Sequence, residues 1–198
     1  VVRIDLASGA RTTVLRNPGG FSRFVVDGDN RVRLGVRPRD DGAVEIAELM
    51  RTGRWRVVTE VPFEDALSSR LVTLDADGAS FLMLDSTGRD RTALVRVEID
   101  TGAKTVIGES ERADVVDLWL DPGTGAPEAF ATEYLRREWR ALDPEAQADL
   151  AFLDAQLDAD FQVVSRSADD ARWIVVEAGP TTSPRSYLYD RVDRAGRR

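Results

Sequence analysis

Apolar and polar residues alternate along most of this chain in short runs that end in turn residues. The run Val2-Arg3-Ile4-Asp5-Leu6 places its apolar side chains on one face of an extended strand, and a turn around Gly9 follows. Runs of this kind predict antiparallel strands joined by tight hairpins. The other strands predicted in this way cover residues 11–15, 21–27, 31–37, 44–50, 55–61, 71–74, 80–85, 93–99, 104–107, 115–120, 127–134, 161–165, 173–178 and 187–192.

One strand-and-turn cassette recurs along the chain. Residues 2–12 match residues 95–105 without a gap at an offset of 93, and looser copies lie at residues 44–55, 137–144 and 187–196. The turn residues of the five copies, which are 44, 49, 42 and 52 positions apart, are Gly9, Gly53, Gly102, Pro144 and Gly196. A period of this size, carried by alternating strands, is typical of β-propeller blades. We therefore predict an all-β fold, a partial β-propeller of about four blade-sized repeats of four-stranded antiparallel sheets.

The repeats predict a single partial propeller domain over residues 1–198. Its repeats are a half blade at about 1–20, blades at 21–62 and 70–108, a blade with a helix insertion at 113–160, and an incomplete blade at 161–192. Residues 196–198 are expected to form a polar tail. Both chain ends then supply a third-position strand, so we expect an open arc whose sheet edges favour self-association.

The alternation stops after Leu142, and one inserted helix is predicted near residues 144–157. Asp143 suits the N-cap, and Pro144 suits the first helical position, where no amide hydrogen is needed. The residues that form one apolar stripe along this helix are Ala146, Leu150, Leu153 and Leu157. The polar residues expected to face away from that stripe are Glu145, Gln147, Asp149, Asp154 and Gln156.

Composition narrows the possible partners. A hydrophobic content of 42% and a charged content of 31% fit a soluble globular protein. The net charge of −8 disfavours nucleic acid and anionic membranes, which need a concentrated positive surface. No apolar run could cross a bilayer and no signal peptide is recognisable, so the sequence is compatible with the cytoplasm or the periplasm. The chain begins without Met inside a strand pattern, which suggests a segment of a larger protein.

The sequence gives little indication of catalytic residues. The chain has no cysteine and no histidine, which excludes disulfides, thiolate catalysis and a Ser-His-Asp relay. Half-matches to the Gly-x-Ser-x-Gly elbow at Ser22, Ser80 and Ser110 lack the second glycine. An enzyme that works with carboxylates alone, as in glycoside hydrolysis, would need pairs that the sequence does not reveal. We therefore predict no catalytic residue within the chain.

Metal and cofactor motifs are equally incomplete. The Asp-rich segments at residues 27–30 and 75–78 are shorter than a calcium loop and lack its closing glutamate, which favours ordinary hairpin turns. Residues 123–125, Gly-Thr-Gly, lack the third glycine of a dinucleotide fingerprint and are followed by Pro127 instead of a helix. We predict no metal ligand and no cofactor-binding residue.

Two groups of side chains could have either a binding role or a structural role. The cluster of Glu133, Tyr134, Arg136 and Arg137 could hold a peptide terminus by charge-assisted hydrogen bonds. A solvated strand with alternating charges is the favoured reading, because most such runs lie at the surface. The four tryptophans fall in different repeats, and packing between blades explains them better than a ligand cage. They are Trp55, Trp119, Trp139 and Trp173.

Three parts of the sequence resemble a known family. Residues 165–176 have the sequence Ser-Arg-Ser-Ala-Asp-Asp-Ala-Arg-Trp-Ile-Val-Val, and they are followed by Pro184 and by the run Tyr-Leu-Tyr-Asp at 187–190. They resemble the S-x-S-x-D-x-x-x-x-[IL]-V stretch and the Y-x-Y-D strand in the N-terminal propeller of prolyl oligopeptidase-family serine peptidases. That family includes acylaminoacyl- and dipeptidyl-peptidase-like enzymes. Residues 142–144 and the acidic helix resemble the element that interrupts a blade in that group. The resemblance is best over residues 130–192.

The resemblance implies a role for the chain without giving it a catalytic residue. In that family an α/β-hydrolase domain follows the propeller and carries the serine, aspartate and histidine, and none of those motifs matches a position here. The propeller caps the active site so that only short peptides enter. We therefore expect a non-catalytic propeller segment whose partners are the hydrolase domain and peptide substrates of a parent peptidase. The alternative is a stand-alone propeller-type binding or scaffold module for a protein or a glycan.

Overall fold

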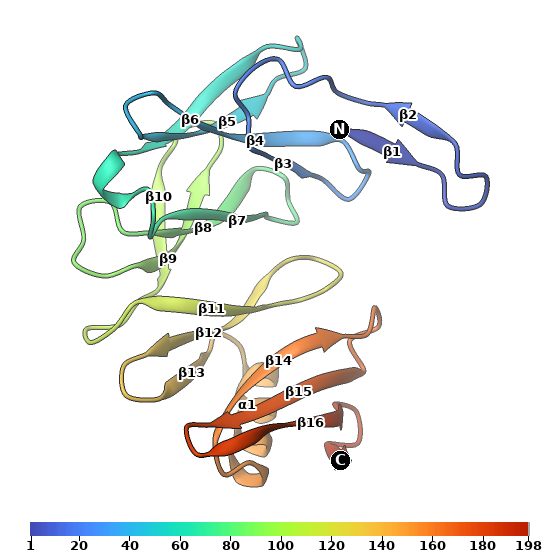
Figure 1. The fold of residues 1–198 in the computed structure, drawn as a ribbon, viewed down its shortest axis with the longest axis vertical. Coiled ribbons are helices and arrows are strands. Elements are labelled where there is room, and N and C mark those ends of the chain that lie inside the picture. The colour runs from blue at the N-terminus through green and yellow to red at the C-terminus, as the bar shows by residue number, and fades with distance from the viewer. Residues whose placement is uncertain (198) are drawn as a thin grey trace. The chain divides into compact units, whose positions relative to one another are not determined.

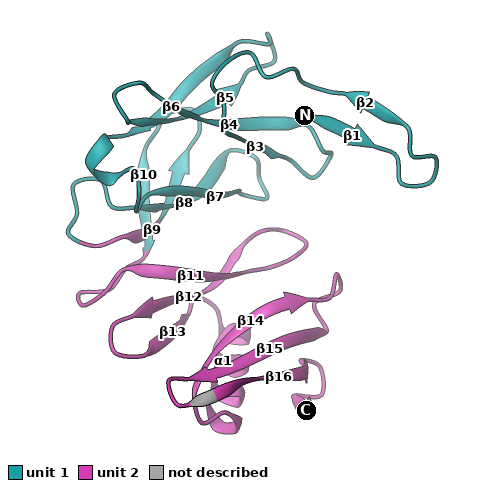
Figure 2. Ribbon diagram, in the orientation of Figure 1, with its two compact units in different colours: residues 1–90, 95–107 teal, residues 91–94, 108–198 magenta. Residues whose placement is uncertain are grey.

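The computed structural model describes residues 1–197, which form two compact units (Figure 2). Unit 1 comprises residues 1–90 and 95–107, and unit 2 comprises residues 91–94 and those from 108 onward. That residues 1–198 form a single domain, with the repeat boundaries given above, stays a prediction. No helix within residues 1–197 has the length and apolar character needed to span a bilayer.

Unit 1 contains a hairpin and two antiparallel sheets whose strands are neighbours in chain order (Figure 1). The hairpin consists of β1 (Val2–Ile4) and β2 (Arg11–Thr13). The first sheet consists of β3 (Arg23–Val26), β4 (Val32–Pro38), β5 (Val44–Leu49) and β6 (Trp55–Val61). After a short 3₁₀ helix at Phe63–Asp65, the second consists of β7 (Arg70–Leu74), β8 (Ser80–Asp85), β9 (Ala93–Glu98) and β10 (Lys104–Gly108).

Unit 2 contains a three-stranded sheet, one helix and a four-stranded sheet. The first sheet consists of β11 (Val115–Leu120), β12 (Pro127–Glu133) and β13 (Arg137–Ala141). Helix α1 (Pro144–Gln156) follows β13 at the position where a fourth strand follows in the other sheets. The second sheet consists of β14 (Asp160–Arg166), β15 (Arg172–Gly179), β16 (Thr182–Asp190) and β17 (Ala195–Arg197).

These elements confirm the predicted fold class of propeller-type four-stranded antiparallel sheets with an inserted helix, and no sheet closes on itself within residues 1–197. Strands β6, β8 and β11 begin and end at the predicted residues. The helix begins at Pro144 because the side chain of Asp143 accepts hydrogen bonds from the amides of Glu145 and Ala146. Capping of this kind satisfies donors that the first helical turn leaves unpaired.

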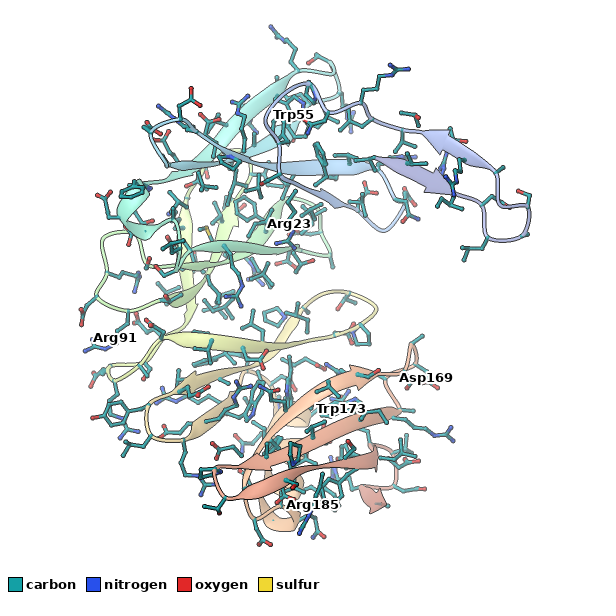
Figure 3. The ribbon with its side chains drawn as sticks, viewed as in Figure 1. Arg23, Trp55, Arg91, Asp169, Trp173 and Arg185 are labelled. Carbon is teal, nitrogen blue, oxygen red and sulfur yellow. The ribbon has the colours of Figure 1, made fainter. Side chains whose placement is uncertain are left out.

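The core of unit 1 is centred on β8. All six residues of this strand are buried, because it lies between β7 and β9 and carries the apolar run Phe81-Leu82-Met83-Leu84. A continuous apolar run is typical of a strand that is covered on both faces. Arg23 joins the two sheets of this unit, because its Nη2 atom donates to the carbonyl of Val72 at 3.0 Å (Figure 3).

The core of unit 2 is aromatic. The ring of Trp119 lies 4.8 Å from that of Trp139 and 4.9 Å from that of Trp173, so the tryptophans join the sheet of β11–β13 to the sheet of β14–β17. Packing between sheets is thereby confirmed for these three residues. Trp55 differs, because it packs at 4.2 Å against Phe21, which precedes β3 in its own sheet (Figure 3).

Two local predictions were wrong. The tail expected from residue 196 instead contributes to β17, which pairs with β16 after a turn in which Arg194 has a φ of 45°. A strand of three residues has too little alternation to be recognised. Asp149 was expected to face away from the apolar stripe of α1 but is buried. It lies one turn from Ala146 and Leu153 on the covered face, where its charge is compensated by an arginine.

Candidate functional site

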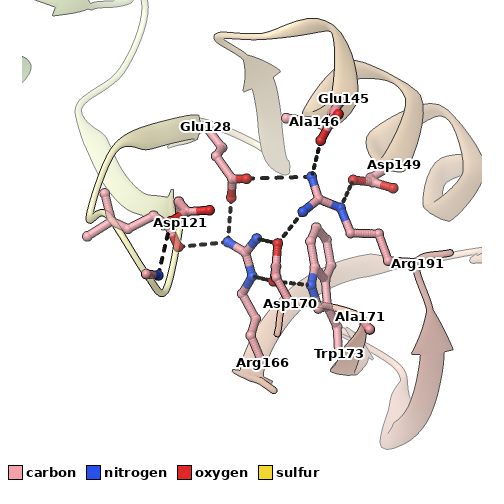
Figure 4. A network of polar contacts seen from close by, with 12 residues as sticks. Asp121, Glu128, Glu145, Ala146, Asp149, Arg166, Asp170, Ala171, Trp173 and Arg191 are labelled. Carbon is pink, nitrogen blue, oxygen red and sulfur yellow. Dashed lines mark hydrogen bonds and ion pairs between the residues drawn. The ribbon is translucent and has the colours of Figure 1, made fainter. Parts of the chain in front are cut away.

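A buried network of arginines and carboxylates lies at one end of the sheets of unit 2 (Figure 4). Arg166 stands at the end of β14 and donates through Nη1 to the carbonyl of Leu120 at 2.8 Å and to Glu128. Its Nε and Nη2 atoms bind both carboxylate oxygens of Asp170. The guanidinium lies 4.4 Å from the ring centre of Trp173, which adds a cation–π contact.

Arg191, which follows β16, extends this network to the helix. Its Nε atom donates to Asp149 of α1 at 2.7 Å, and a further nitrogen pairs with Asp170. The hydroxyl of Tyr189 donates to the other oxygen of Asp149, also at 2.7 Å. Glu128 lies 3.5 Å from Arg191 and completes a circuit that links α1, β12, the turn between β14 and β15, and the end of β16.

The electrostatics of this network favour a fixed charge pattern. Burial alone would lower the pKa of Arg166, but its hydrogen bonds to Asp170 and Glu128 raise that pKa above its ordinary value. Burial likewise opposes the charge of Arg191, whose bond to Asp149 raises its pKa. Burial raises the pKa of the Tyr189 phenol, and its bond to Asp149 adds to that shift. These groups therefore keep one protonation state over the physiological pH range.

Three carboxylates of the network have the spacing of metal ligands. One oxygen from each of Asp121, Glu128 and Asp170 lies within 4.8 Å of the others. Arg166 binds two of these three groups directly, so its guanidinium supplies the positive charge that a cation would supply there. The arrangement is that of an ion-pair network which ties distant segments together.

A groove of about 610 Å³ surrounds the turn between β12 and β13 and gathers the polar-aromatic cluster that the sequence indicates. Arg136 donates to Asp160 at 2.8 Å, and Arg137 donates to Asp117 at 2.7 Å and to Glu133 at 3.3 Å. These pairs join the strand ends that border the groove. They hold both arginines in place.

The aromatic part of this groove is more accessible. Tyr134 is exposed, and the guanidinium of Arg112 lies 5.6 Å from its ring centre while also binding Glu138 at 2.7 Å. Asp154 of α1 borders the same groove, where partial burial raises its pKa. The arginines of the groove are thus engaged by carboxylates. Recognition of a peptide terminus at this cluster stays a prediction.

The serines of the three half-matched elbows lie in different surroundings. Ser22 donates to the carbonyl of Val36 at 3.3 Å, Ser80 is buried and donates to Asp75 at 3.3 Å, and Ser110 accepts from the amide of Arg112 at 3.2 Å. Each hydroxyl is therefore used in a local turn or strand contact.

The Asp-rich and Gly-rich segments form hairpin turns. Asp27 accepts from the amides of Asp29 and Arg31, and Asp77 accepts from the amide of Ala79. In the segment at residues 121–125, the carboxylate of Asp121 accepts from the amides of residues 123 and 124. These side chains close turns in the way that aspartate does in hairpins.

The arginine network as a whole cannot be recognised from the sequence pattern. Residues that pair directly in it are up to 63 positions apart, as in the pair of Arg191 and Glu128. One signal was present, since Arg166, Asp170 and Trp173 all lie within the stretch that resembles the peptidase propellers. The spacing of four between Arg166 and Asp170 could have indicated a local ion pair.

The chain matches no protein-family model. It is 35% identical over 191 residues, which is 96% of its length, to dipeptidyl aminopeptidase BIII of Pseudoxanthomonas mexicana. The chain is a homologue of one segment of that peptidase. It spans 28% of the relative's length. The resemblance to dipeptidyl-peptidase-like enzymes, read from residues 165–190, is confirmed.

One solved structure shows the same fold at low sequence identity. An oligogalacturonate lyase in complex with manganese matches all of this chain and 58% of its own, with a TM-score of 0.61 and 12% identity. At that identity the similarity concerns the fold alone. A prolyl endopeptidase structure matches 98% of this chain and 37% of its own, with a TM-score of 0.46 and 16% identity.

Proposed function

We propose that this chain is a non-catalytic propeller segment that gates the active site of a serine peptidase, whose α/β-hydrolase domain lies outside residues 1–198. The observation that carries the proposal is the 35% identity to a dipeptidyl aminopeptidase over 96% of this chain. Peptide hydrolysis in the whole protein would then depend on residues beyond this segment. The chain itself has no histidine and no cysteine from which a nucleophile could be activated.

A gate has to keep its shape while it excludes large substrates, and unit 2 has the interactions for that task. The network of Arg166 and Arg191 connects the helix to both sheets of the unit. Buried networks whose members are all satisfied make a structure rigid. A rigid wall selects by size, because a folded polypeptide cannot enter where an extended dipeptide can. This mechanism requires no chemistry from the wall.

Two measurements test the proposal. The purified chain is assayed against dipeptidyl 4-nitroanilides, and we expect no turnover, since turnover would contradict a non-catalytic role. The complete gene product that carries this segment is assayed with peptides of increasing length that share one N-terminal dipeptide. Gating predicts that kcat/KM falls steeply with length.

A matched pair of variants separates gating from intrinsic specificity. Asp149→Ala loosens the network, whereas Gln147→Ala changes an exposed polar side chain on the same helix that does not border the groove. We expect Asp149→Ala to raise cleavage of long peptides relative to short ones, and Gln147→Ala to leave the ratio unchanged. Equal cleavage of long and short peptides by the unmodified protein would overturn the gating role. A gene product with no peptidase activity that binds a protein or glycan would support the stand-alone module.

A further inference from the structure

The groove at the turn between β12 and β13 has an apolar wall that reaches solvent. Tyr134 and Leu135 belong to this turn, are 61% and 87% exposed, and line the groove of about 610 Å³. Trp139 of β13 and Phe161 of β14 extend the wall. Ligand sites commonly have volumes of about 300–1,000 Å³ and combine apolar walls with a few polar groups. The groove therefore has the size and the lining of a binding site.

The cations of this groove are already paired. Arg112, Arg136 and Arg137 each bind a carboxylate of the chain at 2.7–2.8 Å. An anionic ligand would have to break one of these ion pairs before it could bind an arginine. A carboxylate, such as the C-terminus of a peptide, is therefore a poor ligand for the groove.

Two carboxylates of the groove, by contrast, lack a cation. Asp154 lies in the last turn of α1 and Asp158 lies just after the helix, and both are exposed and line the groove. Neither side chain has a hydrogen bond or an ion pair within residues 1–197. Partial burial raises the pKa of Asp154, and no cation of the described residues opposes that shift. The negative charge of the groove is thus uncompensated.

The position of these carboxylates at the end of the helix adds to that charge. The C-terminal end of a helix carries a partial negative charge, so lysine and arginine stabilise it and aspartate does not. The last turn of α1 contains Asp154 and no basic residue. Natural sequences break such local preferences mainly at functional sites. A bound cation would compensate both the carboxylates and the helix end.

The chain itself shows how a cation is held in such surroundings. Arg166 lies 4.4 Å from the ring centre of Trp173 while it binds two carboxylates. Arg112 lies 5.6 Å from the ring centre of Tyr134 while it binds Glu138. A guanidinium suits both kinds of contact, because it is planar, stacks on aromatic rings and forms parallel hydrogen bonds with a carboxylate.

We propose that this groove binds an arginine side chain of another polypeptide in an extended conformation. Asp154 and Asp158 would bind the guanidinium, and Tyr134 and Leu135 would contact the apolar part of the arginine and the residue beside it. A metal ion would bind the carboxylates without using the apolar wall, which favours a peptide. This inference does not depend on the proposed peptidase role, because it concerns binding and not hydrolysis.

Peptide binding to the complete chain tests the proposal. The probe is the tetrapeptide Ala-Leu-Arg-Ala with acetylated and amidated ends, and its control contains citrulline, a neutral residue of the same shape, in place of arginine. We expect calorimetry to show about tenfold tighter binding of the arginine peptide, because citrulline cannot form charge-assisted hydrogen bonds. In an NMR titration, the shifted amides should be those of residues 134–138 and 154–161.

Neutral variants make the result specific to the groove. Asp154→Asn with Asp158→Asn should weaken binding of the arginine peptide by about tenfold. Asp40→Asn with Glu64→Gln removes the same charge from exposed positions of unit 1 and should leave binding unchanged. Because the charge of Asp154 is uncompensated, the first variant should unfold at the same urea concentration as the unmodified chain or at a higher one. Loss of binding then cannot result from unfolding.

Four results would overturn the proposal. One is equal binding of the arginine and citrulline peptides, and another is unchanged binding of the arginine peptide by Asp154→Asn with Asp158→Asn. A third is absence of binding at about 1 mM peptide. The fourth is equally tight binding of a peptide that has a free amino terminus and no arginine, because the groove would then recognise a terminal amine.

Discussion

Replacement of Asp149 by alanine removes the carboxylate that joins helix α1 to the end of β16. The side chain is 1% exposed and accepts hydrogen bonds from Tyr189 and Arg191, both at 2.7 Å. Alanine leaves the buried hydroxyl of Tyr189 without its hydrogen-bond acceptor and removes one of the carboxylates that Arg191 binds. Position 149 lies on the covered face of the helix, so water cannot readily replace the lost carboxylate.

The size of the effect follows from these contacts. A hydrogen bond to a charged group contributes about 1.5–3 kcal/mol, and removal of one partner of a buried ion pair costs about 3–5 kcal/mol. Arg191 keeps its contacts to Asp170 and Glu128, which reduces the penalty. We therefore expect Asp149→Ala to lower the free energy of unfolding by about 3 kcal/mol. Tyr189→Phe, which removes one hydrogen bond to a charged carboxylate, should cost about 1.5–3 kcal/mol.

Urea unfolding followed by tryptophan fluorescence measures this loss, because Trp119, Trp139 and Trp173 all lie in the core of unit 2. The control is Gln147→Ala, an exposed position of the same helix, which should change stability by no more than about 0.5 kcal/mol. A loss below about 1 kcal/mol for Asp149→Ala, or one equal to that of the control, would refute a stabilising role for the network.

Three further substitutions test the reasoning in unit 1. Burial alone would raise the pKa of Asp85, but hydrogen bonds from Lys104 and from Thr87 in its own turn lower that pKa. The ionised carboxylate therefore stabilises the folded state above the pKa of the unfolded state. This contribution is lost as the pH falls through the pKa of the folded state. The difference in unfolding free energy between the unmodified chain and Asp85→Asn should therefore shrink between about pH 5 and pH 2 in urea titrations. Gly102→Ala places a Cβ 2.8 Å from a carbonyl oxygen, whereas Gly9→Ala meets open space at the same φ of 71°, so chemical unfolding should show about 2 kcal/mol more loss for the former. Gly35→Ala brings a Cβ to 2.6 Å from an aromatic ring and should cost about 1–3 kcal/mol in thermal unfolding.

Most of the fold could be predicted because its signals are local. β8 is an apolar run bounded by Asp75-Ala76-Asp77-Gly78 on one side and a polar segment on the other, and both of its ends were predicted. Asp143 and Pro144 marked the start of α1 in the same way. β17 could not be predicted, because Ala195-Gly196-Arg197 forms a strand only through its pairing with β16.

The arginine network could not be predicted because its partners are brought together by tertiary structure. Asp149 is a polar residue on a helix and is expected to face solvent, unless a cation from elsewhere compensates its charge. That cation is Arg191, which is 42 positions away. The spacing of these two residues in the sequence gives no sign that their side chains are in contact. The pair of Arg166 and Asp170, by contrast, lies within one motif and could have been recognised.

The two copies of the cassette separate what local sequence determines from what a neighbour determines. Val2 and Val95 stand at equivalent positions before the same turn, with the same glycine conformation, and one is half exposed while the other is buried. The turn is therefore a property of the cassette, but burial is a property of the strand beside it.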